Sequence, residues 1–189
     1  MNQYFTIILF AIIMNNCTGD GISDSANFYF TYFPLSVGNT WYYNDTGSAS
    51  NRPDLRRVIK NRIEINGKIY YLVEDTYGYE SQWPASNIDT VYKDNQGRIF
   101  RYSGNGDYLL YDFSAIDGSS YKYKDYVVTV KKVGLVETPA GNFDNCIEIF
   151  FDIPVSIDDE IWYTFAPNAG LILRWMGEGP GYILDSYEF

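Results

Sequence analysis

The chain has 189 residues, a formal net charge of −10 and no histidine, and 19% of its residues are aromatic. The high aromatic content excludes a disordered chain, and the acidic balance argues against a nucleic-acid partner because phosphates require a basic surface. Without histidine, Ser-His-Asp and Cys-His catalysis and histidine-ligated zinc are excluded. At this length, one domain with a substantial core is the default expectation.

An apolar run at residues 4–14 is about as long as the hydrophobic part of a signal peptide and too short to cross a bilayer as a helix. We predict a signal peptide over residues 1–16 and export of the protein. Cys17 follows, and residues 17–27 form a Gly-, Ser- and Asp-rich stretch that suits a flexible tether. This pattern resembles a bacterial lipoprotein start, which implies that Cys17 carries a lipid anchor to a membrane. Secretion after simple removal of the leader is the alternative.

The clearest structural signal is Asn66-Gly67, which stands between two apolar runs at residues 58–65 and 68–74. Asn-Gly supplies the two positive-φ residues of a type I′ turn, so a β-hairpin is predicted here. Period-two alternation places three side chains of the first run on one face: Ile59, Ile63 and Ile65.

Similar runs, separated by Gly, Pro and Asn, continue to the end of the chain. A second hairpin is predicted from residues 90–93 and 98–102 around the turn 94–97. Further strands are predicted at 108–113, 126–133, 143–153, 160–165, 171–176 and 182–187. No segment after the leader has helical spacing. We therefore predict an all-β fold, with a single antiparallel domain over residues 28–189 built as a curved sheet, a sandwich or a half-barrel.

Segments 33–43 (FPLSVGNTWYY), 138–149 (TPAGNFDNCIEI) and 161–172 (IWYTFAPNAGLI) occur in this order, with LYDFS at 110–114. Together they resemble a group of uncharacterised, β-rich bacterial envelope lipoproteins with FPL-x-VGN-x-W and TPAG-x-F-x-x-C segments. The resemblance implies export and β structure and brings no catalytic residues. Turn formation and core packing explain the same motifs, and this structural interpretation is the one we favour.

Cys146 lies in a strand-like context without a nearby Lys or Arg, so we expect a buried core residue rather than a nucleophile. The remaining acid–base candidates are carboxylates: Glu74, Asp75, Asp152, Asp158, Asp159 and Glu160. A glycosidase would need two of them to face each other across a sugar, whereas a solvated turn is the simpler explanation for residues 158–160. If the strands flanking that turn pair, crowded carboxylates would bind calcium weakly before they would act as catalysts.

Adjacent strand residues such as Tyr42 and Tyr43 point to opposite faces, so some tyrosines must lie on the surface or line a concavity. We predict a non-enzyme without a cofactor or a structural metal, in the cell envelope or secreted. It would act as a non-catalytic binding or structural module, with a protein or glycan partner left open. The alternatives are a periplasmic carrier of an apolar ligand in an aromatic-lined half-barrel, an accessory subunit of a surface assembly and a carboxylate-dependent glycan hydrolase.

Overall fold

The computed structural model describes residues 32–47, 53–78, 84–157, 159–177 and 181–189. Within these ranges all regular structure is strand, and twelve strands form one antiparallel sheet, which confirms the predicted all-β class. The strands are β1 (Thr40–Asp45), β2 (Leu55–Ile65), β3 (Lys68–Tyr77), β4 (Ala85–Lys93), β5 (Ile99–Tyr102), β6 (Asp107–Tyr111), β7 (Ser120–Tyr123), β8 (Tyr126–Thr138), β9 (Gly141–Asp152), β10 (Ile161–Ala166), β11 (Gly170–Met176) and β12 (Tyr182–Glu188). A search of the described residues finds no helix long and apolar enough to cross a membrane.

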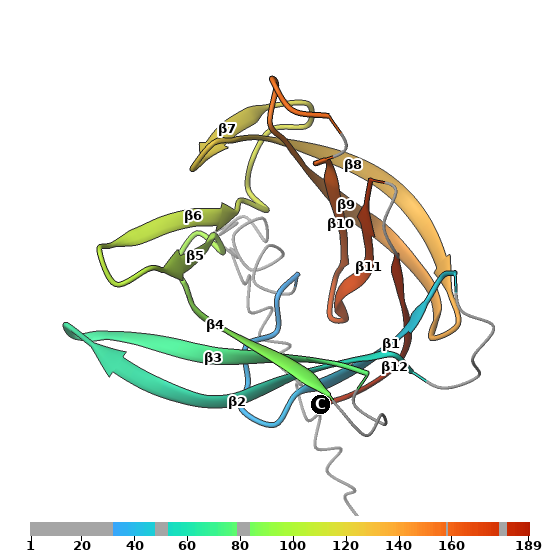
Figure 1. Ribbon diagram of the computed structural model, residues 1–189, viewed down its shortest axis with the longest axis horizontal. Coiled ribbons are helices and arrows are strands. Elements are labelled where there is room, and N and C mark those ends of the chain that lie inside the picture. The colour runs from blue at the N-terminus through green and yellow to red at the C-terminus, as the bar shows by residue number, and fades with distance from the viewer. Residues whose placement is uncertain (1–31, 48–52, 79–83, 158, 178–180) are drawn as a thin grey trace, which may run out of the picture.

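The strand order is β6-β5-β4-β3-β2-β1-β12-β11-β10-β9-β8-β7, so β1 pairs with β12, and β6 and β7 are the two edges. Figure 1 shows the sheet curling round until these edges face each other. The fold is therefore one strongly curved, nearly closed sheet rather than a sandwich. Side chains bridge the seam, since the Tyr121 hydroxyl on β7 donates to the Leu110 carbonyl on β6 at 2.8 Å.

Both predicted hairpins form. Asn66 and Gly67 have φ values of 52° and 76°, as a type I′ turn requires. In the β4–β5 turn, the Asp94 carboxylate accepts the backbone N–H groups of Gln96 and Arg98, each at 2.9 Å. The later strands also form near their predicted positions, although β8 continues to Thr138, beyond its predicted end at residue 133, and β7 was not predicted.

The prediction that Ile59 shares a face with Ile63 and Ile65 is wrong. The register between β2 and β3 shifts directly after Ile59, where a β-bulge inserts one extra residue. Ile59 then pairs with Val73, whereas Ile63 pairs with Tyr70. Because Val73 and Tyr70 are three positions apart, they lie on opposite faces of β3. The inner face therefore receives Ile59, which is fully buried, and the outer face receives Ile63.

Tyrosines are divided between the two faces of the sheet. On the outer face, Tyr70 packs against Tyr92 with ring centroids 5.3 Å apart, and Tyr92 stacks on Phe100 at 4.9 Å. The Tyr70 hydroxyl donates to Asp107 at 2.9 Å. Cross-strand packing of this kind stabilises a twisted sheet, and it accounts for these aromatic residues without a ligand.

The segment before β1 fills the deep interior of the sheet. Tyr32 and Phe33 are both buried. Tyr32 stacks on Phe113 with ring centroids 5.3 Å apart, and Phe33 packs against Phe165 at 6.0 Å. Phe113 comes from the β6–β7 connection, so this one cluster holds together the start of the described chain, the seam and β10. The filled interior argues against a carrier with a deep apolar cavity.

Two of the motif segments, 33–43 and 161–172, contact each other in this interior. The Trp41 indole N–H donates to the Ala169 carbonyl at 2.5 Å. Gly170 has φ +85°, and a Cβ there would lie 3.2 Å from Pro34 Cδ and 3.4 Å from Trp41 Nε1. Segments 33–43 and 161–172 therefore dock against each other through Trp41 and Gly170, which supports the structural interpretation of both motifs.

Candidate functional site

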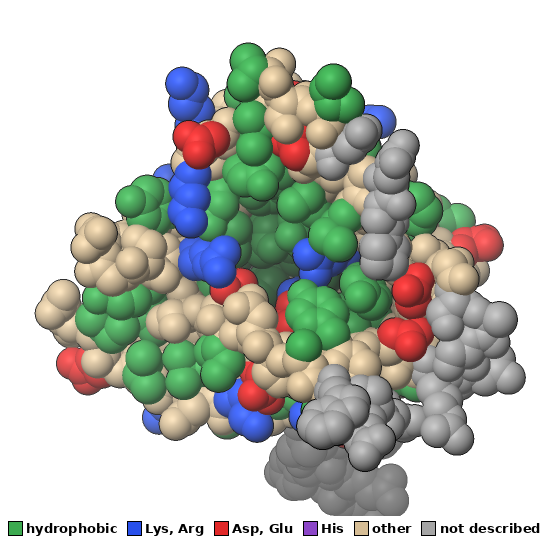
Figure 2. Space-filling model, in the orientation of Figure 1, with side chains coloured by type: hydrophobic (Ala, Val, Ile, Leu, Met, Phe, Trp, Pro, Cys, Tyr) green, Lys and Arg blue, Asp and Glu red, His purple; other side chains and the backbone are tan. Residues whose placement is uncertain are grey.

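The sheet leaves a hollow that opens toward the viewer in Figure 2, with hydrophobic side chains on its wall and charged side chains at its edge. Five inward-facing residues from four strands form a polar cluster on the inner face of the curved sheet. We call them the inner polar cluster: Arg57 on β2, Asp75 and Tyr77 on β3, Tyr163 on β10 and Arg174 on β11. Arg57 and Asp75 are buried, whereas Tyr77, Tyr163 and Arg174 remain partly exposed.

Arg57 and Asp75 form a buried, bidentate ion pair. The Nε and one terminal nitrogen of Arg57 each donate to a different oxygen of Asp75, both at 2.7 Å. Both side chains are about 10% exposed. Burial opposes the charge on Arg57, but the Asp75 carboxylate outweighs burial and raises the pKa of Arg57 well above its usual value. Arg57 therefore remains a cation, and the two oxygens of Asp75 compensate its charge.

Arg174 is held differently. One of its terminal nitrogens donates to the Tyr77 hydroxyl at 3.0 Å, and the other lies 2.9 Å from the Met176 sulfur, which is a weak acceptor. Its Nε is buried without a hydrogen-bond partner. None of the ion pairs among the described residues includes Arg174. Burial opposes its charge, but Tyr163 and Tyr77 raise its pKa on balance, so Arg174 remains a cation.

The bond from Arg174 to Tyr77 crosses the interior, because β12, β1 and β2 lie between β11 and β3 in the sheet. Aromatic rings lie beside this bond. The Arg174 guanidinium lies 5.7 Å from the Tyr163 ring centroid, and the Tyr77 and Tyr182 rings are 6.0 Å apart. Burial raises the pKa of Tyr163 and of Tyr182, so these hydroxyls stay neutral at physiological pH and keep their protons as hydrogen-bond donors.

This arrangement suits binding better than catalysis. Asp75 is occupied by Arg57, and the partly buried Arg174 has no carboxylate partner among the described residues. The inner polar cluster thus combines a guanidinium that no described carboxylate compensates, neutral hydroxyl groups and aromatic rings. Such a site can hold an anionic group attached to an apolar body.

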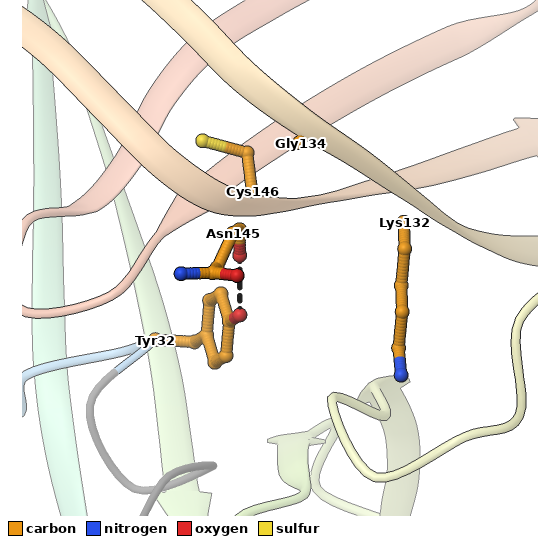
Figure 3. A pocket seen from close by; sticks show the side chains of 5 residues that line it. All are labelled: Tyr32, Lys132, Gly134, Asn145 and Cys146. Carbon is orange, nitrogen blue, oxygen red and sulfur yellow. Dashed lines mark hydrogen bonds between the residues drawn. The ribbon is translucent and has the colours of Figure 1, made fainter.

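Cys146 is a packed core residue, as predicted from the sequence. It is 1% exposed, and its sulfur lies 3.2 Å from the Phe143 carbonyl oxygen. Burial, followed by the nearby Asp144, raises the pKa of the thiol to about 11. Cys146 lies beside a small pocket of about 170 Å³ that Lys132 and Asn145 also line. Figure 3 shows the Cys146 side chain pointing away from these two side chains.

We expect the Cys146 thiol to react slowly in the folded protein. In the Cys17→Ser variant, where Cys146 is the single thiol, its alkylation at pH 8 should be at least ~10-fold slower than in denaturant, because the reactive thiolate is scarce and inaccessible. The measurement is the time course of iodoacetamide modification by mass spectrometry. Equal rates in the folded and unfolded chain would contradict a packed thiol.

Three of the candidate carboxylates that the structure describes are engaged in other contacts, since Asp75 pairs with Arg57. Glu74 and Asp75 point to opposite faces, and Glu74 pairs with Lys60 on the outside at 3.2 Å. Asp159 accepts the backbone N–H of Ile153 at 2.8 Å and so closes the β9–β10 loop.

The strands β9 and β10 do pair, as the calcium hypothesis required. Among the described residues, however, no three acidic or thiol side chains are grouped in a way that could hold a metal ion. Asp158 and Cys17 lie outside the described residues.

Asp75 was expected from the sequence as a candidate acid and Tyr77 as one of several tyrosines that could line a concavity, whereas Arg57, Tyr163 and Arg174 were not predicted. A usable signal was present. Arg57 lies between Leu55 and Ile59 at the same period-two spacing, and Asp75 stands two positions after Val73. A charged residue in an otherwise apolar, inward series marks a buried ion pair or a site. No comparable local signal identified Arg174, because its partner Tyr77 is 97 residues away.

Two solved structures share this fold. One comes from Bacteroides fragilis and carries the provisional description of an exported protein with a YmcC-like fold. It has a TM-score of 0.52 and 14% identity over 84% of this chain and 99% of its own. The other, from Parabacteroides distasonis and provisionally described as a lipoprotein, has a TM-score of 0.51 and 14% identity over 84% of this chain and 98% of its own. No protein-family model matches the chain, and no curated protein matches it significantly. At 14% identity the likeness establishes a common fold.

Proposed function

We propose that this chain is an exported, lipid-anchored cell-envelope protein that acts as a non-catalytic binding module, with its ligand held in the hollow. The observation that carries the proposal is the inner polar cluster, in which a partly buried guanidinium with no carboxylate partner among the described residues stands beside tyrosine rings. An unsatisfied buried donor in a native fold requires an explanation, and a bound ligand is one. Export and anchoring rest on the leader and Cys17, and the descriptions of the two structural neighbours agree with them.

The filled core restricts the form that binding can take. The rings of Tyr32, Phe33 and Phe113 occupy the deep interior. A ligand would therefore occupy only the open part of the hollow, beside Tyr77 and Tyr163. This supports a module that holds one end of a ligand, rather than a carrier that encloses an entire apolar molecule.

Anchoring is tested by replacing the proposed acylation site. We expect Cys17→Ser to move the protein from the membrane fraction to the soluble fraction, because the lipid would be its sole anchor. The mature wild-type chain should begin at Cys17 with added acyl mass, as measured by intact mass spectrometry.

Cys146→Ser is the matched control, since it removes the other cysteine, and it should leave the protein on the membrane. A wild-type chain that begins at Met1 and fractionates with the cytosol would contradict export. Unchanged membrane retention of Cys17→Ser would contradict the anchor.

A further inference from the structure

The two inner arginines use the same edge of the guanidinium in different ways. In Arg57, Nε and one terminal nitrogen form the fork that grips both oxygens of Asp75. In Arg174 the corresponding Nε has no acceptor, and the terminal nitrogen nearest Met176 contacts sulfur. This edge of arginine matches the two oxygens of a carboxylate or a phosphate. Arg174 therefore presents an anion-binding fork that no oxygen of the described residues fills.

A flexible side chain contacts one nitrogen of the fork. Met176 lies across it, with Sδ 2.9 Å from a terminal nitrogen of Arg174. Methionine is unbranched and has three rotatable side-chain bonds, so it can move aside at low cost. The other terminal nitrogen is held by Tyr77 at 3.0 Å, which fixes the direction of the guanidinium. Movement of Met176 would free this terminal nitrogen of the oriented guanidinium for another acceptor.

The surroundings define the rest of the ligand. Tyr163 lies beneath the guanidinium, and the Tyr77 and Tyr182 rings pack together at the same place. These rings offer apolar surface beside the charge. The chain carries a net charge of −10, which disfavours a polyanion such as a nucleic acid. A ligand with one anionic head group and an apolar body can use the aromatic surface and carries too little charge to be repelled strongly by the acidic chain.

We propose that Arg174 binds the carboxylate or phosphate head of an amphiphilic monoanion, whose apolar part lies against Tyr77, Tyr163 and Tyr182. This inference rests on the proposed binding function and adds the ligand class and the residue that selects it. Met176 acts as the movable cover of the site.

The test compares three ligands that each contain ten carbon atoms: decanoate, decyl phosphate and decanol. Binding to the full chain below the micelle concentration is followed by calorimetry. We expect at least one of the anions to bind at least ~10-fold more tightly than decanol, because only the anions fill the fork. The stronger of the two anions identifies the head group. Its affinity should fall with added salt, whereas the affinity for decanol should not.

Arg174→Gln should lower the affinity for the anion at least ~10-fold and leave the affinity for decanol unchanged, while Arg174→Lys should lose part of the affinity because it keeps the charge without the fork. Met176→Ala should bind the anion at least as tightly as wild type. Arg98→Gln is the matched control, since Arg98 is paired with Asp94 in a turn, and it should bind like wild type. Circular dichroism verifies that each variant is folded.

The outcomes separate the two proposals. If decanol binds as tightly as the anions, or if Arg174→Gln binds them like wild type, the anion site is refuted while the binding module stands. If none of the three ligands binds, both proposals fail. If Arg174→Gln does not fold, the salt dependence of anion binding to the wild-type chain and the Met176→Ala result decide the question.

Discussion

Asp75→Asn should destabilise the protein by about 3–5 kcal/mol, because it leaves the Arg57 guanidinium buried without its counter-charge. Both side chains of the pair are about 10% exposed, so water cannot replace the lost carboxylate. The free energy of unfolding is measured by urea titration followed by circular dichroism. The Cys17→Ser chain is the background for this and the next experiment, because it lacks the proposed acylation site.

Glu74→Gln is a matched control for this change. Glu74 precedes Asp75 in β3 and also pairs with a cation of β2, but it lies on the outer face, where its Lys60 partner is 50% exposed. Exposed pairs of this type contribute about 0–1 kcal/mol. A loss for Asp75→Asn no larger than that for Glu74→Gln would show that the inner pair is not isolated from water.

Trp41→Ala should cost about 3–5 kcal/mol, the range for removing a buried tryptophan from a packed core. Trp41 is 3% exposed, and its indole N–H donates to the Ala169 carbonyl, which joins segments 33–43 and 161–172. Trp41→Phe keeps most of the ring and removes the hydrogen bond, so it should cost about 1–3 kcal/mol through the unpaired carbonyl. Urea titration of the two variants separates ring packing from the hydrogen bond.

Trp175→Ala is the control with the same change of side chain. Trp175 lies on β11 and is 42% exposed, so its removal should cost at most about 1 kcal/mol. If Trp41→Ala were no more destabilising than Trp175→Ala, the docking of segments 33–43 and 161–172 would not be a determinant of stability.

Packing of aromatic side chains in the interior of the sheet also explains why the motif segments stand out in the sequence. Segments 33–43, 110–114 and 161–172 all contribute to one aromatic cluster, through Phe33, Tyr111 and Phe165. The inner polar cluster uses none of these segments except 161–172, which contributes Tyr163. The motifs thus describe the packing of the fold, and the candidate site is built mainly from residues outside them.

The sequence by itself determined the strands and the turns, because these depend on neighbouring residues. Asn66-Gly67 supplies the positive φ values of its hairpin wherever the hairpin lies, and alternating runs form strands in any sheet. The burial of Cys146 also followed from its immediate context. The extent of the domain over residues 28–189 and the signal peptide remain predictions.

The tertiary structure alone decided which faces and which distant residues meet. The bulge after Ile59 reverses the faces of the rest of β2, and a bulge depends on how two strands pair. Closure of the sheet depends on the twist added by each of twelve strands, which no single segment encodes. Arg174 and Tyr77 are 97 residues apart and come together only because the curved sheet brings β3 and β11 to face each other. The strands are local properties of this chain, and its candidate site is a property of the curved, nearly closed sheet.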